Sequence, residues 1–90
     1  MDPCALVEEL LDEEIARQAR FDAAGDPRAA ACAWRIQYLE HLLGTLVQFP
    51  LTGERFVELL RANMAITNPS FPDVPHASVD LLRRWEARAH

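Results

Sequence analysis

The sequence predicts an all-α protein, in which a long antiparallel helical hairpin and two shorter helices form a small four-helix bundle-like domain with a Pro-rich connector. Apolar residues recur at helical spacing through most of the chain. Helix start and stop residues divide this pattern into four segments, and no segment shows the alternation typical of a β-strand. With 90 residues, the chain has the length of one domain, 1–90, with room for one modest core but not for a deep enzyme cleft.

The first helix is expected over about 3–24. Asp2 is a favourable N-cap and Pro3 is tolerated at the first helical position. Gly25 favours a stop immediately after the helix. Its apolar stripe consists of Val7, Leu11, Ile15 and Ala19, and is flanked by Leu6 and Leu10.

The second helix is expected over about 27–49, with Asp26 and Pro27 repeating the start signal and Pro50 ending it. Two adjacent apolar stripes indicate a helix that is covered on more than one side. One stripe is Cys32, Ile36, Leu39, Leu43 and Leu46, and the other is Trp34, Tyr38, Leu42, Thr45 and Phe49. The short Gly25-Asp26 link predicts an antiparallel hairpin.

A third helix is expected over about 53–66, after the N-cap Thr52, and a fourth over about 78–89, capped by Ser78. Between them, 67–77 contains three prolines and is expected to be an irregular connector that Phe71 and Val74 attach to the core. The expected core consists of Leu11, Ile15, Ile36, Leu39, Leu43, Phe56, Leu60, Leu82 and Trp85.

The net charge of −5 is concentrated at the start of the chain, because residues 1–14 contain six acids and no base. Such a chain repels free nucleic acid and attracts basic protein surfaces. Four carboxylates on one side of the first helix are therefore expected to dock on a basic partner: Glu8, Glu9, Asp12 and Glu13. The alternative is a solvated face that complements the helix dipole. A calcium site is not expected, since a straight helix face cannot surround an ion.

Trp34 and Tyr38 lie one helical turn apart, with Arg35 beside them. Aromatic and Arg side chains are the types that anchor protein interfaces. The sequence therefore predicts a second partner-binding group at these three residues. The alternative is that the aromatic pair belongs to the core or lies beneath the connector.

No pattern in the sequence indicates catalysis, a cofactor or a metal. Cys4 and Cys32 are expected ~22 Å apart across the hairpin, too far for a disulfide. The histidines, at positions 41, 76 and 90, lack ligand spacing, and the three glycines form no phosphate-binding loop.

Arg83, Arg84 and Arg88 are expected to form a small basic tip on the fourth helix, paired with acids of the same chain or of an oligomer. A DNA-reading helix-turn-helix built from the last two helices is disfavoured. The connector is far longer than the usual turn of about 3–4 residues, and the overall charge opposes DNA.

These features predict a small acidic, non-enzymatic protein-binding module that docks on a larger basic partner, for example one that normally holds nucleic acid. It would act as an inhibitor or adaptor, for example a phage or mobile-element inhibitor such as an anti-CRISPR protein. The alternatives are a homo-oligomerising helical-bundle subunit, such as a homodimer, and a DNA-binding regulator. A chain rich in Ala and free of Lys indicates a bacterial or phage source. The acidic start and short apolar runs predict a cytoplasmic protein without a membrane span.

Overall fold

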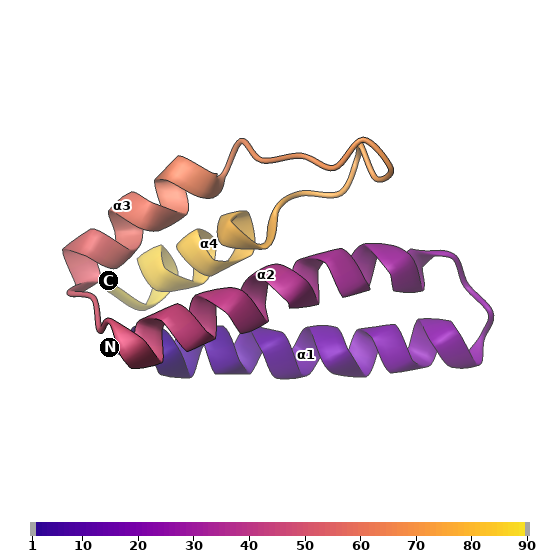
Figure 1. The fold of residues 1–90 in the computed structure, drawn as a ribbon, viewed down its shortest axis with the longest axis horizontal. Coiled ribbons are helices and arrows are strands. Elements are labelled where there is room, and N and C mark those ends of the chain that lie inside the picture. The colour runs from indigo at the N-terminus through magenta and orange to yellow at the C-terminus, as the bar shows by residue number, and fades with distance from the viewer. Residues whose placement is uncertain (1, 90) are drawn as a thin grey trace.

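The computed structural model describes residues 2–89 and confirms the all-α fold. The helices are α1 (Pro3–Ala23), α2 (Arg28–Gln48), α3 (Gly53–Asn63) and α4 (Ala77–Ala89). The first two form the expected antiparallel hairpin, and α3, the connector and α4 lie over one side of it (Figure 1). Helix α4 packs against all three other helices and thereby joins this second layer to the hairpin.

Three of the local signals at the helix ends behave as the sequence predicts. Asp2 Oδ1 accepts a hydrogen bond from the Cys4 N–H at 3.0 Å, and Thr52 Oγ1 accepts one from the Arg55 N–H at 3.3 Å. Gly25 has a φ of 64°, a left-handed conformation that glycine adopts at little steric cost. These caps satisfy backbone groups that a helix leaves unpaired at its ends.

All helix boundaries except the end of α3 lie within one residue of the prediction. Helix α3 ends at Asn63, three residues before the predicted end at 66, and the Asn63 side chain instead donates a 2.8 Å hydrogen bond to the Tyr38 hydroxyl. Helix α4 starts at Ala77, and the predicted cap Ser78 lies inside the helix, fully buried. The capping contact comes from His76, whose Nδ1 accepts the Ser78 N–H at 3.2 Å. A histidine is not a usual N-cap, so sequence preference pointed to the serine.

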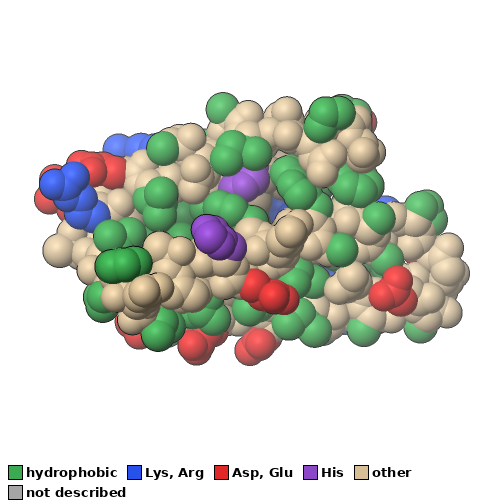
Figure 2. Space-filling view, viewed as in Figure 1, with side chains coloured by type: hydrophobic (Ala, Val, Ile, Leu, Met, Phe, Trp, Pro, Cys, Tyr) green, Lys and Arg blue, Asp and Glu red, His purple; other side chains and the backbone are tan. Residues whose placement is uncertain are grey.

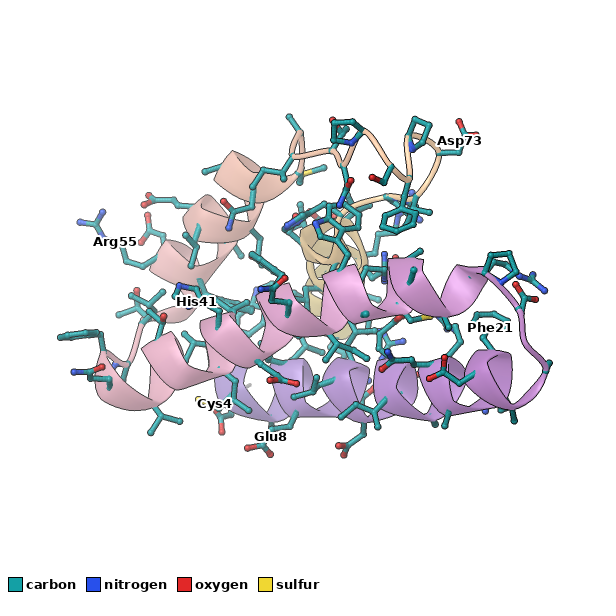
Figure 3. All side chains as sticks on the ribbon, turned by 45° about the vertical axis from the view of Figure 1, so that its right-hand side comes forward. Cys4, Glu8, Phe21, His41, Arg55 and Asp73 are labelled. Carbon is teal, nitrogen blue, oxygen red and sulfur yellow. The ribbon has the colours of Figure 1, made fainter. Side chains whose placement is uncertain are left out.

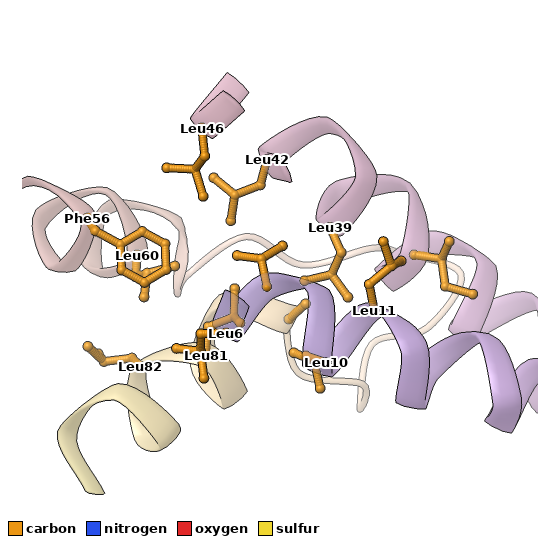
Figure 4. Close-up of a cluster of buried hydrophobic side chains, with 13 residues drawn as sticks. Leu6, Leu10, Leu11, Leu39, Leu42, Leu46, Phe56, Leu60, Leu81 and Leu82 are labelled. Atoms are coloured by element: carbon orange, nitrogen blue, oxygen red, sulfur yellow. The ribbon is translucent and has the colours of Figure 1, made fainter. Parts of the chain in front are cut away.

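One apolar core is shared by all four helices (Figure 4). Most of the predicted core residues are buried, while Leu43 and Trp85 are half-buried and pack against the core. The Phe56 and Trp85 rings meet edge to face with 5.2 Å between centroids, which holds α3 against α4. The core residues are Leu6, Val7, Leu10, Leu11, Ile36, Leu39, Leu42, Leu46, Phe56, Leu60, Ala77, Leu81 and Leu82.

The prediction for Ile15 is wrong: this side chain is 47% exposed, whereas its neighbour Glu14 is completely buried. Long antiparallel helices pack along a seam that repeats every seven residues. Position 14 lies seven residues after Val7 and seven before Phe21, and thus on that seam. Because the two helices contact each other along this seven-residue repeat, Glu14 faces α2 and Ile15 faces solvent.

Candidate functional site

The predicted acidic face divides into two pairs of carboxylates. Glu9 and Glu13 face α4 and form ion pairs with its arginines. Arg88 donates to Glu9 at 2.5 and 2.7 Å, and Arg84 bonds both carboxylates. The expected pairing of the basic tip with acids of the same chain is thus found for Arg84 and Arg88.

These ion pairs also set the titration of the two carboxyls. The hydrogen bonds from Arg88 and Arg84 lower the pKa of Glu9, with the Arg88 bond as the larger cause. The bond from Arg84 likewise lowers the pKa of Glu13. Both groups are therefore ionised at neutral pH and already neutralised by cations within the chain.

Glu8 and Asp12 form the other half of the predicted face. Both are exposed, and neither has an ion-pair partner among residues 2–89. Glu8 projects from the outer side of the hairpin, away from the α3–connector layer (Figure 3). Acidic side chains mark this edge of the surface over α1 (Figure 2). The freely available part of the predicted acidic face is this pair.

Trp34 and Tyr38 are half-buried beneath the connector, where both rings meet the His76 ring edge-on, at centroid distances of 5.8 and 4.1 Å. Phe71 lies 6.4 Å from the Trp34 ring. Burial lowers the pKa of His76, and the nearby Arg35 charge adds to this effect. Burial also raises the pKa of Tyr38. The aromatic pair thus holds the connector in place, in agreement with the alternative prediction that these two residues lie beneath it.

The same aromatic side chains also border two shallow cavities between α2 and the α3–connector layer. One, of about 360 Å³, is lined by Trp34, Tyr38, His41 and Ile66, among others. The other, of about 300 Å³, lies beyond Tyr38 and His41 toward Asn63. The labelled His41 lies on the side of α2 that faces α3 (Figure 3). The exposed parts of the aromatic pair therefore belong to a groove on the opposite side of the hairpin from Glu8.

Arg35 does not join Trp34 and Tyr38 at the surface, because it is only 6% exposed. Its guanidinium donates to the Pro75 carbonyl at 2.7 Å, forms an ion pair with Asp80, and lies 3.3 Å from Glu14 Oε1. Arg17 approaches the same Glu14 oxygen at 2.5 Å. The side chain that the sequence placed in an interface instead fastens α1, α2 and the start of α4 together.

This buried ion cluster, consisting of Glu14, Arg17, Arg35 and Asp80, was not predicted from the sequence. The heptad position of Glu14 between Val7 and Phe21 is the one signal that indicates its burial. Buried charges in proteins are normally paired, so a buried Glu14 would in turn have required a cation from the facing helix. Arg35 fills that need because the hairpin brings α2 against α1.

Both cysteines are free thiols. Burial raises the pKa of Cys32, and the charge of Glu14 adds to the increase. The pKa of Cys4 is also raised, first by desolvation and then by Asp2 and Glu8. Raised values keep both thiols protonated and poorly nucleophilic at neutral pH. Among residues 2–89, no three His, Cys, Asp or Glu side chains gather in a group that could hold a metal ion.

Comparisons with protein-family models, with curated proteins and with solved structures give no significant match. Over residues 2–89, no helix has both the length and the apolar character needed to cross a membrane.

Proposed function

We propose that this protein is a non-enzymatic protein-binding module that docks on a basic partner through the outer side of α1. The observation that carries the proposal is the exposure of Glu8 and Asp12 without a cation partner in the described chain. Unpaired charges on one face steer a partner of opposite charge and accelerate association. An inhibitor or adaptor of a nucleic-acid-binding protein needs such a surface, since its target is basic.

The ion pairs with α4 reduce the docking face from four carboxylates to two. Glu9 and Glu13 hold Arg84 and Arg88, so replacing them perturbs the packing of α4 as well as the surface charge. Glu8 and Asp12 are free of this complication. They are therefore the residues that test docking separately from stability.

The experiment is a tagged pull-down from host lysate at low and high salt, followed by binding measurements on the retained protein. The test variant is Glu8→Gln/Asp12→Asn. The control is Glu54→Gln/Asp73→Asn, which removes the same charge from exposed positions outside α1. The proposal predicts a basic partner that the control retains and the test variant loses. Equal binding by both variants, or binding that does not weaken with salt, would contradict it.

A homo-oligomeric subunit is the second candidate, favoured by exposed apolar side chains at the end of α2. Val47 is 70% exposed and Phe49 is 62% exposed. Light scattering at several protein concentrations tests this candidate. A dimer that the Val47→Gln/Phe49→Ser variant converts to a monomer would support it, and a wild-type monomer at all concentrations would exclude it.

The DNA-binding alternative requires Arg83, Arg84 and Arg88 to face DNA together. It receives less support, because Arg84 and Arg88 are already engaged by Glu9 and Glu13. The absence of a mobility shift on DNA at low salt would remove it.

A further inference from the structure

A cavity of about 300 Å³ lies beside the buried ion cluster, between the second half of α1, the first half of α2 and the end of the connector. Its charged lining residues are Glu14, Arg17, Arg28, Arg35 and Asp80, and its apolar lining includes Phe21 and Val74. It is separate from both the outer acidic pair and the aromatic groove. Phe21 marks its place near the hairpin turn (Figure 3).

Two atoms of this cluster are buried without a hydrogen-bond partner in the described chain: Glu14 Oε2 and Arg35 Nε. The hydrogen bonds and ion pairs of the cluster are unevenly distributed over the atoms of Glu14 and Arg35. Arg17 and Arg35 both approach Glu14 Oε1, while Arg35 uses its two terminal nitrogens for Pro75, Asp80 and Glu14. Leaving a buried charged group partly unsatisfied is costly. The cluster therefore has one unused acceptor and one unused donor on two residues that line the cavity.

The charges of the cluster indicate which head group fits. Glu14 and Asp80 balance Arg17 and Arg35, so the four side chains are neutral together, and the charge of Arg28 is balanced by its ion pair with Asp26. A carboxylate would satisfy Arg35 Nε but be repelled by Glu14, and an ammonium group would do the reverse. A primary carboxamide carries an N–H donor and a carbonyl acceptor on one uncharged group. It satisfies both atoms without disturbing the charge balance.

The remaining walls suit an apolar body attached to that head group. Phe21, Ala31, Cys32 and Val74 present apolar atoms to the cavity. A mostly apolar pocket with a few placed polar groups is the usual character of a small-molecule site. Two arginines of the lining border solvent: the Arg17 side chain is 42% exposed and the Arg28 side chain is 71% exposed. Since neither Glu14 Oε2 nor Arg35 Nε has exposed surface, ligand binding requires the side chains that cover these two atoms to move.

We propose that this cavity is a binding site for a small, uncharged carboxamide on an apolar ring, with Glu14 accepting from the amide N–H and Arg35 donating to its carbonyl. The proposal does not depend on the docking function. It assigns a specific role to the two buried atoms that the fold leaves unpaired.

Benzamide is the probe, and benzoate and benzylamine are its charged counterparts of similar shape. Each is titrated into ¹⁵N-labelled protein while the backbone amides and the Arg35 Nε–H are followed by NMR. We expect saturable shifts at Val74, Ala31 and the Arg35 Nε–H with benzamide. Each charged probe loses one of the two hydrogen bonds and should bind about tenfold more weakly or worse.

A cavity-filling variant avoids damage to the ion cluster. Ala31→Leu places a larger side chain in the cavity, and Ala33→Leu makes the same change at an exposed position of the same helix. Benzamide binding should be lost in the first variant and kept in the second. Three results would overturn the proposal: no saturable shift at millimolar benzamide, equal binding of benzoate, or binding that Ala31→Leu leaves unchanged. A slowly exchanging water at the Arg35 Nε–H that benzamide does not displace would overturn it as well.

Discussion

Replacing Arg35 with methionine removes the cation that lies between two carboxylates while keeping much of the apolar volume. The structure shows what is lost: the bond to the Pro75 carbonyl, the ion pair with Asp80 and the contact with Glu14. Glu14 has no exposed surface, so its charge can relax only toward Arg17. Breaking a buried ion pair from one side costs about 3–5 kcal/mol. A chain of this length is stable by about 5–13 kcal/mol.

We therefore expect Arg35→Met to lower the free energy of unfolding by about 3–5 kcal/mol in urea titrations followed by circular dichroism. The double variant Glu14→Leu/Arg35→Met removes both buried charges and should recover part of that loss, since an apolar pair avoids the desolvation of ions. The matched control is Arg55→Met, whose ion pair with Glu58 is exposed and should contribute less than about 1 kcal/mol.

Two results would refute this reasoning. A loss in Arg35→Met no larger than that in Arg55→Met would mean that the cluster adds little to stability. A double variant less stable than Arg35→Met would mean that the Glu14 charge is well satisfied without Arg35.

Three further predictions concern the fold. Because burial lowers the pKa of His76, the contribution of this neutral side chain to the free energy of unfolding should be fully present above the unfolded pKa of about 6.5. It should be lost as the pH falls through the folded pKa. Urea titrations between about pH 7.5 and 5 check this, and His76→Ala should remove most of the pH dependence. Gly25→Ala should lower the unfolding free energy by about 1 kcal/mol, because Gly25 has a φ of 64°; thermal unfolding measures it. Leu39→Ala should cost about 2–5 kcal/mol, whereas Ile15→Ala, at a position 47% exposed, should cost far less; equal losses would contradict the observed seam.

The sequence was most informative where a residue acts on its own backbone. Asp2, Gly25 and Thr52 mark helix ends because each satisfies or permits a local conformation that needs no distant partner. The short link at Gly25 then leaves an antiparallel hairpin as the arrangement of the first two helices. Fold class and helix order follow from such local signals and from apolar periodicity.

The candidate sites were less predictable, because their side chains find partners far along the chain. Glu9 and Glu13 resemble Glu8 and Asp12 in the sequence, yet only the first pair meets the arginines of α4. Which carboxylates remain free for a partner depends on where α4 packs, and helical periodicity does not give that position.

Within α1, too, the burial of side chains depends on distant partners: Glu14 is buried and Ile15 is exposed, the reverse of what their polarity suggests. Local apolar spacing placed Ile15 inside, but the packing of α1 on α2 buries Glu14, which is possible because Arg35 arrives from the facing helix. The sequence by itself determined the four helices, the helix ends at Asp2, Gly25 and Thr52, and the hairpin, since these depend on contacts a few residues apart. Only the tertiary structure decided which charges are buried, paired or free, because that depends on groups that meet across helices.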